Sequence, residues 1–457
     1  MTSVVWFRND LRLSDNSALA EAVASGAVVP LYVWSPEDEG DWPLGAASRW
    51  WLHHSLLSLD ASLKRLGSRL VIRRGPAQKV VPAVVQEVGA TSLQFSRRYE
   101  PAAREVEASV VAAVEKLGVR ATVRGNALLR EPWEVATADG RPYQVFTPYW
   151  KACLAGPEPP LPTGAPARLR APNAWPASLT VDDLELLPKV DWAAGLRESW
   201  EPGEAGAKKL LDRFAGGPVD SYASDRNRPD IEGTSRLSPH LHFGEISIRE
   251  VWHACRRSSV FASELGWREF AYHLLWHFPH TPTEPLREQF RDFPWADDAE
   301  ALQRWRKGLT GYPFVDAGMR ELWHTGWMHN RTRMVVASFL VKDLLIPWQQ
   351  GARWFWDTLV DADLANNTLG WQWTAGCGAD AAPYFRIFNP VGQGKKFDPE
   401  GRYVRRWVTE LAGNSSGDVH EPWNSLEGVA SGYPEPIVDH AAARQRALAA
   451  FEGLRRS

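Results

Sequence analysis

Glu264 and Trp267 stand three residues apart in the segment Glu264-Leu-Gly-Trp-Arg-Glu-Phe270, a spacing that places both on one face of a helix. A buried carboxyl beside an indole can hydrogen-bond to the edge of a flat base and stack on its ring. Asn330 and Met334 are four residues apart and would share a helix face in the same way. For the first segment alone, an exposed acid beside a core tryptophan is the simpler interpretation, so the spacing identifies candidates only.

A second segment, Gly233-Thr-Ser-Arg-Leu-Ser238, clusters hydroxyl groups and backbone amides just before a helical pattern. Such a turn can hold a phosphate through its amide and hydroxyl donors. The alternative is that the serine and threonine side chains only cap the helix, which is their commonest use at a helix start. The segment becomes informative only together with those that follow it in the chain.

The elements that must position these residues change in kind along the chain. Up to about residue 130, short apolar runs alternate with helical patterns, which predicts an α/β domain built on a doubly wound parallel sheet. No Gly-x-Gly-x-x-Gly segment follows the first strand, so we expect a ligand in this domain to lie at the carboxyl ends of the strands. The expected strands are 4–7, 28–34, 70–72, 92–95 and 121–123, with helices around 19–23 and 50–66.

Beyond residue 130 the chain first becomes rich in proline, as in Gly156-Pro-Glu-Pro-Pro-Leu-Pro162. This composition is typical of a long connector between domains. From about residue 205 onward the patterns are helical and are broken by glycine and proline. We therefore expect an α/β domain at 1–130, a connector at 131–204 and an all-helical domain at 205–457.

Composition limits the class of protein. The 457 residues are 44% hydrophobic and 23% charged, as in ordinary globular proteins, and no apolar run reaches the roughly 20 residues of a membrane span. The N-terminal residues include Arg8, Asp10 and Arg12, which are not typical of a signal peptide. The widely spaced cysteines 153, 255 and 377 favour reduced core thiols over disulfides or a cysteine metal site. We expect a protein of the bacterial cytoplasm that uses no metal.

The net charge and the tryptophan content limit which kind of molecule the protein can bind and how. The net charge of −3 means that any binding of nucleic acid must come from a local basic surface. The 24 tryptophans are unusually many, and most of them can be explained as bulky fillers of a large helical core. Core packing need not account for all of these tryptophans.

Further segments appear downstream in a fixed order. Together with those above and with the opening Trp6-Phe-Arg-Asn-Asp-Leu-Arg12, they resemble the photolyase and cryptochrome family over essentially the whole chain. The resemblance implies an N-terminal α/β antenna domain and a C-terminal helical domain that holds FAD in a folded, U-shaped conformation. The downstream segments are Gly311-Tyr-Pro-Phe-Val-Asp316, Thr325-Gly-Trp-Met-His-Asn-Arg-Thr-Arg-Met334, Asp361-Ala-Asp-Leu-Ala-Asn-Asn-Thr-Leu-Gly-Trp-Gln-Trp373, Phe385-Arg-Ile-Phe-Asn-Pro390 and Gln393-Gly-Lys-Lys-Phe-Asp398.

The resemblance also implies which residues hold the flavin. Arg333 and Asp361 match the ion pair beside the isoalloxazine ring, Asp363 lies near the other edge of the ring, and Asn367 faces its N5 atom. The flavin diphosphate would be held by Tyr222, Thr234, Ser235, Arg236, Leu237 and Ser238.

Side chains at this site distinguish the members of the family. In (6-4) photolyases the positions of Asn330 and Met334 are both histidine, which the chemistry of that lesion requires, and His329 alone does not restore the pair. In plant cryptochromes the position of Asn367 is typically an aspartate, which can protonate the flavin, and Trp373 tends to be lost. These differences favour repair of cyclobutane pyrimidine dimers. The segment 356–364 is more like that of plant cryptochromes, and together with the segment Asn366-Asn-Thr-Leu-Gly370 it resembles the bacterial class III photolyases, the group most similar to plant cryptochromes.

The resemblance assigns roles in repair. Reduced FAD would give one electron, under blue light, to a dimer flipped out of the DNA duplex. Glu264 would hydrogen-bond to a pyrimidine carbonyl and Asn330 would hold the same base edge. Met334 would pack against the dimer, between walls formed by Trp267 and Trp373.

A chain of tryptophans, Trp371, Trp348 and Trp295, matches the residues that reduce oxidised flavin by stepwise electron transfer in the family. The indole ring suits this task because it is oxidised at an accessible potential. Core packing is the alternative, and Trp354 and Trp356 offer a competing branch.

The resemblance also implies binding partners. We expect a monomer that binds DNA containing pyrimidine dimers, with an antenna chromophore of the methenyltetrahydrofolate type, although other branches use a deazaflavin or none. Glu100 lies near the place where folate-binding members contact the pigment. The alternatives are a photoreceptor of the cryptochrome type and a thermal flavin oxidoreductase. The expected contacts to the DNA backbone are Arg226, Arg268, Arg331, Gln393 and Lys396.

Overall fold

A computed structural model describes residues 1–381, 386–414, 419–424 and 432–456. Phe385, the first residue of the Phe385–Pro390 segment, lies outside these ranges. The description that follows concerns the described residues alone.

The N-terminal part is the expected α/β domain, with a five-stranded sheet in the order β3-β2-β1-β4-β5 and parallel pairing throughout. The chain passes outward from β1 on one side and then returns to add β4 and β5 on the other, which makes the sheet doubly wound. The strands are β1 (Thr2–Phe7), β2 (Ala27–Trp34), β3 (Val71–Arg74), β4 (Ser92–Ser96) and β5 (Arg120–Arg124).

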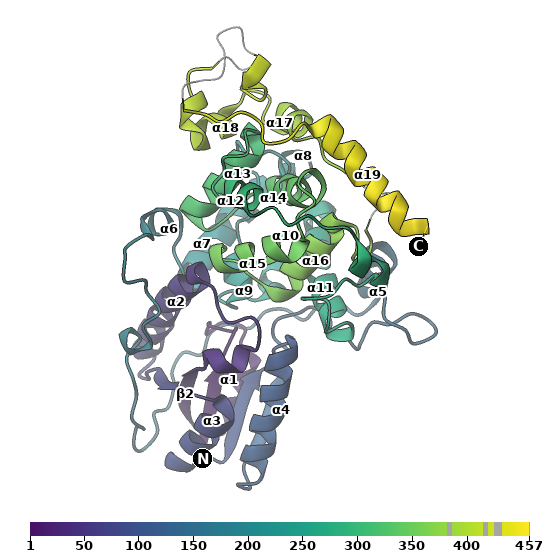
Figure 1. The fold of residues 1–457 in the computed structure, drawn as a ribbon. Helices are drawn as coiled ribbons and strands as arrows, with labels where there is room; N and C mark the ends of the chain where they lie inside the picture. Colours follow the sequence, from purple (N-terminus) through teal and green to yellow (C-terminus); the bar gives the residue numbers. More distant parts are fainter. Residues whose placement is uncertain (382–385, 415–418, 425–431, 457) are drawn as a thin grey trace.

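The helices of this domain cover both faces of the sheet (Figure 1). Every residue of β2 is buried, as expected for an inner strand of a sheet covered on both sides. The alternation of strands and helices predicted from the sequence is therefore confirmed. The helices are α1 (Ser17–Ser25), α2 (Ala46–Arg65), α3 (Ala77–Glu87) and α4 (Pro101–Glu115), with a 3-10 turn η1 (Pro36–Glu39).

The proline-rich stretch after β5 runs back along the sheet before it reaches the helical part. The amide of Val28 donates to the carbonyl of Arg170, and the amide of Leu179 donates to the carbonyl of Ile72. Two helices that the sequence patterns did not predict interrupt this stretch, α5 (Phe146–Ala155) and α6 (Ala194–Ser199), besides the 3-10 turn η2 (Asp182–Leu184). Helix α5 packs against α11 of the helical part, so it belongs to the wall of the site described below.

The described residues after 203 form helices and turns without a strand, as the periodicity predicts. The longer helices surround a core rich in tryptophan, and α19 lies along one edge (Figure 1). No helix in the described ranges is both long and apolar enough to cross a membrane. The helices are α7 (Glu204–Ala215), α8 (Pro218–Asp225), α9 (Ser238–His242), α10 (Ile248–Cys255), α11 (Ser259–His277), α12 (Ala299–Arg306), α13 (Pro313–Thr325), α14 (Asn330–Ser338), α15 (Trp348–Thr358), α16 (Leu364–Ala375), α17 (Pro390–Phe397), α18 (Arg402–Trp407) and α19 (His440–Arg456).

Shorter elements join these helices. A π-helical turn, η4 (Phe339–Asp343), continues directly from α14, and 3-10 turns occur at η3 (Glu288–Asp292), η5 (Thr409–Leu411) and η6 (Pro422–Asn424).

Buried polar contacts join the α/β part to the helical part. Asp15 pairs with Arg249 at 2.8 Å. The indole nitrogen of Trp51 donates to a carboxylate oxygen of Glu245 at 3.0 Å, and Arg12 donates to the carbonyl of Gly244 at 2.9 Å. Since buried charges are costly unless they are paired, these contacts specify how the two parts dock.

Candidate functional site

Arg333 and Asp361, which the family resemblance predicts to pair beside the isoalloxazine ring, do form an ion pair. Arg333 Nη2 is 3.0 Å and 2.8 Å from the two carboxylate oxygens of Asp361, whose side chain is only 3% exposed. The guanidinium also donates from Nε to the carbonyl of Met328 at 2.7 Å. Helix α14 and the turn before α16, which are remote in the sequence, are therefore held together by one charged group.

Asp363 forms the N-cap of α16 and accepts a hydrogen bond from the amide of Asn366 at 2.9 Å. Its other carboxylate oxygen lies 3.3 Å from His242 Nδ1 and accepts from the Tyr272 hydroxyl. Burial acts to raise the pKa of Asp363, but the hydrogen bond and charge of His242, the charge of Arg268 and the hydrogen bond from Tyr272 together outweigh it and hold the pKa below its usual range. The acid is thereby kept as an anion. Neither His242 nor Tyr272 was predicted as a partner of Asp363, because both lie far from it in the chain.

Asn367 follows one turn later on α16. Its side-chain amide donates to the carbonyl of Ala352 on α15 at 3.1 Å, which orients the group. An amide cannot supply the proton that an acid at this position would supply.

The turn at 233–238 has the backbone features of a ligand cradle. Arg236 has φ of 53°, which is strained for a residue other than glycine. A Cβ on Gly233 would lie 2.8 Å from the Cβ of Asp225, so only glycine permits this approach of the turn to α8. The N-cap position of α9 is Leu237 and makes no side-chain cap, so capping does not account for the hydroxyl groups of this segment.

Several polar atoms of the helical part are buried and have no hydrogen-bond partner among the described residues. They are Nε of Arg236, Nε2 of His242, Nε2 of His329 and Oε1 of Gln393. Buried polar groups in native proteins are nearly always hydrogen-bonded, so these atoms are available to a bound polar ligand or to water. Together with the cradle at 233–238 and the Arg333–Asp361 pair, they fit a flavin dinucleotide. Tyr222, which is also predicted to hold the diphosphate, is buried on α8 beside the turn.

Glu264 on α11 pairs with Arg226, the residue directly after α8, at 2.6 Å. Burial raises the pKa of Glu264, and the charge and hydrogen bond of Arg226 offset only part of that rise. Two residues predicted for different tasks, a base contact and a DNA contact, are therefore direct partners here.

The aromatic walls of the site come from three elements. The ring of Trp267 on α11 stacks on Phe146 of α5, with centroids 3.9 Å apart and an interplanar angle of 10°. Trp373 lies half-buried on α16, which packs against α11 and α14. Asn330 is exposed at the start of α14, and Met334 follows it by one turn and is half-buried. The sequence analysis did not predict a role for Phe146, because this residue lies in the segment that was expected to be a connector.

Basic side chains gather beside Glu264. Arg331 donates to the Asn227 side chain at 2.7 Å and lies over the ring of Phe397, 4.5 Å from its centroid. Lys396 is exposed and lies 5.2 Å over the same ring. Burial and the like charges of Arg226 and Arg386 lower the pKa of Arg331. The repulsion within this cluster favours a bound anion.

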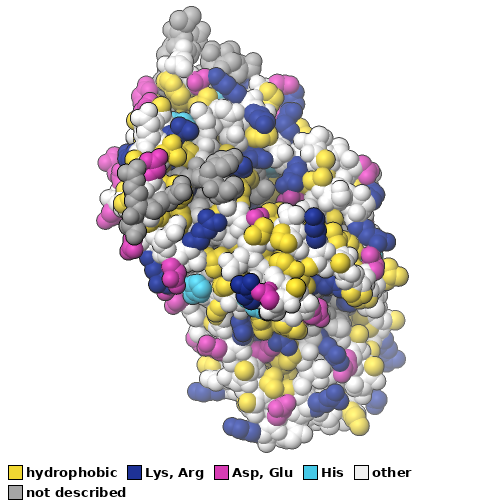
Figure 2. Space-filling model, turned by 90° about the vertical axis from the view of Figure 1, so that its right-hand side faces the viewer, with side chains coloured by type: hydrophobic (Ala, Val, Ile, Leu, Met, Phe, Trp, Pro, Cys, Tyr) yellow, Lys and Arg dark blue, Asp and Glu magenta, His cyan; other side chains and the backbone are white. Residues whose placement is uncertain are grey.

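Arg386 was not predicted and belongs to the same cluster. Gln393, another predicted DNA contact, is half-buried on α17, the helix that also carries Lys396. The side of the molecule shown in Figure 2 mixes Lys and Arg side chains with hydrophobic ones over the helical part. A surface of this kind suits nucleic acid, which offers both phosphates and apolar base faces.

Arg268 lies apart from this cluster, although the same DNA contact was expected of it. Its side chain is 11% exposed, donates to the carbonyl of Ala127 at 2.7 Å and lies 4.9 Å over the ring of Tyr272. In this position Arg268 holds Tyr272 and, through it, Asp363 in place, and it is poorly placed to contact DNA.

Trp371 lies buried on α16 against the backbone of α15. A Cβ on Gly351 would be 2.0 Å from the Trp371 ring, and Phe355 meets the same ring edge-on at 5.0 Å. Trp348 is buried at the start of α15, one turn before Gly351. A backbone hydrogen bond from Ala296 to Leu345 brings the segment of Trp295 beside the residues that lead into α15.

The competing tryptophans lie in different places. Trp354, one turn after Gly351, stacks on Trp323 with centroids 5.9 Å apart and an interplanar angle of 4°. Trp323 is 65% exposed, so this stack ends at the surface. Trp356 instead donates to the carbonyl of Pro43 and lies against Trp42 in the α/β part.

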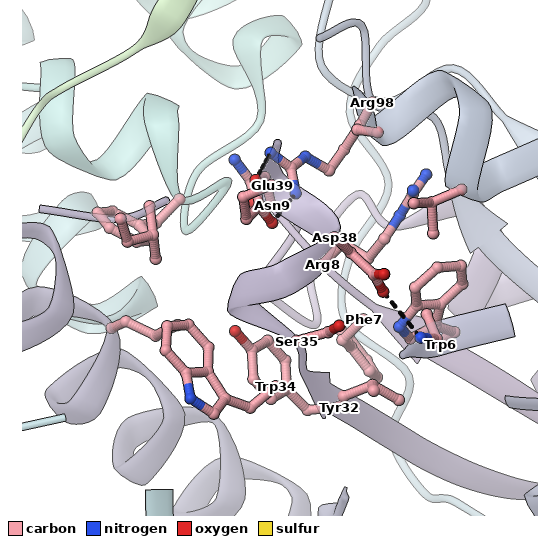
Figure 3. A pocket seen from close by; sticks show the side chains of 17 residues that line it. Trp6, Phe7, Arg8, Asn9, Tyr32, Trp34, Ser35, Asp38, Glu39 and Arg98 are labelled. Carbon is pink, nitrogen blue, oxygen red and sulfur yellow. Dashed lines mark hydrogen bonds and ion pairs between the residues drawn. The ribbon is translucent and has the colours of Figure 1, made fainter. Parts of the chain in front are cut away.

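A separate pocket lies at the carboxyl ends of β1 and β2, where the doubly wound sheet predicts a ligand (Figure 3). Its free volume is about 60 Å³, and Arg98 closes one side by pairing with Glu39 at 2.7 Å and 2.8 Å. Tyr32 and Trp34 lie on the opposite side. Since small-molecule pockets usually measure about 300–1,000 Å³, this one is too small for a flavin or a folate. Glu100 is buried beside it and pairs with Arg98 at 3.3 Å.

Comparisons with known proteins agree with this geometry. Residues 3–167 match the family described as DNA photolyase, and residues 261–453 match the family described as the FAD binding domain of DNA photolyase. The chain is similar to a deoxyribodipyrimidine photo-lyase of Agrobacterium fabrum, with 46% identity over 99% of this chain and 98% of the relative. It is 41% identical to cryptochrome-1 of Arabidopsis thaliana over 97% of this chain and 69% of that protein. The crystal structure of a bacterial class III photolyase from Agrobacterium tumefaciens superposes with a TM-score of 0.96 and 45% identity, covering 100% of this chain and 98% of the other.

Proposed function

The chain belongs to the DNA photolyase and cryptochrome family, and we propose that it repairs cyclobutane pyrimidine dimers in DNA by light-driven electron transfer from reduced FAD. The observation that carries the proposal is the Glu264 carboxyl, which is half-buried, shares α11 with the stacked Trp267 and pairs with Arg226 of the cationic cluster. Such a pocket can take up a flat, polar-edged lesion attached to a phosphate backbone.

The residues that would hold FAD are those of the cradle and the ion pair. Tyr222 and the turn at 234–238 would bind the diphosphate, and Arg333, Asp361 and Asp363 would line the ring system. When bound, FAD supplies the excitation and the electron. The orienting bond from Asn367 to Ala352 would keep an amide, without an ionisable proton, at the flavin edge.

Glu264 acts on the lesion as a hydrogen-bond donor. A carboxyl can donate to a pyrimidine carbonyl only when it is protonated, and burial already raises the pKa of Glu264. Arg226 would leave Glu264 for a DNA phosphate when the duplex binds, which removes the charge that keeps the pKa down. The neutral acid would then stabilise negative charge on the pyrimidine carbonyl while the ring opens.

The direct test is repair of an oligonucleotide that carries one thymine dimer, with chemically reduced protein, under blue light and in darkness. We expect loss of the dimer only in the light. Glu264→Ala removes a hydrogen bond worth about 1.5–3 kcal/mol and should slow ring opening by about tenfold or more, with binding of the dimer less affected. Glu264→Gln is the matched control, because its amide can still donate. An alanine variant with full repair per absorbed photon would contradict this role.

DNA binding should depend steeply on salt. Arg226, Arg331 and Lys396 would contact phosphates, with Gln393 and Arg386 beside them. Each lost phosphate contact should lower the slope of log affinity against log salt by about 0.9. We expect Lys396→Ala to show this loss in a binding titration at several salt concentrations. Lys116→Ala, which removes an exposed charge at the end of α4, should leave the slope unchanged; equal slopes in both variants would exclude Lys396 from the contact.

Photoreduction would use two tryptophan branches that share Trp371. One branch continues through Trp348 and Trp295, and the other through Trp354 to the exposed Trp323. The contact of Trp356 with Pro43 supports a packing role for that residue instead.

An antenna of the methenyltetrahydrofolate type would need another place than the closed pocket at the strand ends. The rings of Trp133 and Trp276 lie 4.9 Å apart, and the guanidinium groups of Arg97 and Arg104 lie over them at 5.1 Å and 3.7 Å. Aromatic faces beside two cations suit a pterin with a carboxylate tail. We assign the antenna to this edge of the molecule.

The similarity to a plant cryptochrome supports a second candidate, a blue-light photoreceptor without repair activity. Asn367 argues against it, since the amide there cannot act as the proton donor. Absence of repair by protein with bound, fully reduced flavin would favour the photoreceptor.

A further inference from the structure

A pair of buried tyrosines connects the flavin site to the α/β part of the molecule. Tyr272 on α11 and Tyr99, which follows β4, meet edge-on with ring centroids 5.4 Å apart and an interplanar angle of 85°. Both side chains are buried. The Tyr272 hydroxyl donates to Asp363, the acid assigned to the flavin edge. One end of the pair is therefore bonded directly to a residue of the site.

Each phenol has a carboxylate as its hydrogen-bond acceptor. Tyr272 donates to Asp363, and the Tyr99 hydroxyl lies 2.9 Å and 3.1 Å from the two carboxylate oxygens of Glu131. A phenol gives up an electron at an accessible potential when its proton can leave at the same time, and it then becomes a neutral radical. A carboxylate at hydrogen-bond distance is the acceptor that this step requires.

We propose that Tyr272 and Tyr99 form a redox relay that donates an electron to photoexcited, oxidised flavin independently of the tryptophans. In the first step Tyr272 loses one electron to the flavin and its phenolic proton to Asp363. In the second step Tyr99 reduces the Tyr272 radical, the proton returns from Asp363 to Tyr272, and the proton of Tyr99 passes to Glu131. An external thiol finally gives one electron to the Tyr99 radical and becomes a thiyl radical, losing its own proton to solvent, while the proton on Glu131 returns to Tyr99. The relay rests on FAD being bound beside Asp363, as in the proposed function.

The carboxylates beside the two tyrosines favour the radical on Tyr99. Burial raises the pKa of Glu131, so this carboxylate holds a proton more readily than usual. Hydrogen bonds from His242 and Tyr272, with the charges of His242 and Arg268, hold the pKa of Asp363 low despite its burial, so a proton left there is soon returned. The radical is therefore more stable on Tyr99 than on Tyr272.

Aromatic rings continue beyond Tyr99, but cations oppose transfer to them. The ring of Trp276 lies 6.2 Å from Tyr99, and the Arg104 guanidinium lies 3.7 Å over its face. A cation at this distance raises the energy of an indole radical cation. Oxidation therefore goes no further than Tyr99. Because Tyr99 is buried and away from solvent, we expect its radical to be long-lived.

The test uses flavin-loaded Trp371→Phe protein, in which the tryptophan branches are blocked, and time-resolved electron paramagnetic resonance after a blue flash. We expect a tyrosyl signal whose hyperfine splitting collapses when ring-deuterated tyrosine is incorporated. Adding Tyr99→Phe should abolish the long-lived signal and leave only the short-lived radical of Tyr272. Adding Glu131→Gln should also abolish the long-lived signal, because glutamine accepts a hydrogen bond but does not take the proton, whereas a purely structural Glu131 would be rescued by this change.

Tyr433 provides the matched control. It is a buried tyrosine whose hydroxyl donates to the Asp316 carboxylate at 2.6 Å, in another part of the helical core. Trp371→Phe with Tyr433→Phe should keep the tyrosyl signal. A long-lived signal that survives Tyr99→Phe, or no tyrosyl radical in flavin-loaded Trp371→Phe protein, would overturn the relay. Repair by chemically reduced parent protein is measured in parallel, and its failure would count against the proposed function alone.

Discussion

Replacing Arg333 by alanine is expected to destabilise the helical part by about 3–5 kcal/mol and to prevent stable binding of FAD. The reason is the position of Asp361, whose side chain is 3% exposed and has both of its oxygens within hydrogen-bond distance of the Arg333 guanidinium. Removing the arginine leaves a buried, unpaired carboxylate. It also releases the Met328 carbonyl that Arg333 holds at the start of the α14 segment.

The measurement is chemical unfolding together with flavin content. Arg257→Ala is the control, since Arg257 pairs with Asp220 on the surface and its loss should cost at most about 1 kcal/mol. The double change Arg333→Met with Asp361→Asn should recover stability, because neither charge is then left unpaired. A single Arg333→Ala variant as stable as the control would show that Asp361 is solvated in a way that the structure does not indicate.

Replacing Trp371 by phenylalanine is expected to slow light-driven reduction of the bound flavin by more than about tenfold, a barrier increase of at least about 1.4 kcal/mol. Trp371 is the only residue that both proposed tryptophan branches share, and its ring lies against α15 at Gly351, between Trp348 and Trp354. Phenylalanine fills most of the same space but is much harder to oxidise. The slower reduction that remains is assigned to Tyr272 and Tyr99.

Single substitutions beyond Trp371 distinguish the branch through Trp348 from the branch through Trp354. Trp348→Phe or Trp354→Phe should each leave substantial reduction, whereas the two together should reproduce Trp371→Phe, as followed by flavin absorbance under blue light. Trp175→Phe is the control, because Trp175 packs in the α/β part beneath Arg69. If Trp348→Phe alone equals Trp371→Phe, the branch through the Trp354–Trp323 stack carries no electrons.

Sequence alone determined the main architecture. The alternation of apolar runs and helical patterns before residue 130 predicted the parallel sheet, because the side-chain periodicity of strands and helices depends on local sequence. Positions with short-range partners were also predictable. The glycine at 233, the hydroxyl-rich turn and the i, i+4 placement of Asn330 and Met334 follow from local geometry.

The tertiary structure decided which of these residues are partners. Arg226 and Glu264 were assigned to different tasks and form one ion pair, and Arg268 was assigned to the surface and lies over Tyr272. The stack of Trp354 on Trp323, and the acids that accept from Tyr272 and Tyr99, join segments far apart in the chain. Burial, pKa shifts and electron-transfer contacts depend on distances between such segments, and no local pattern encodes those distances.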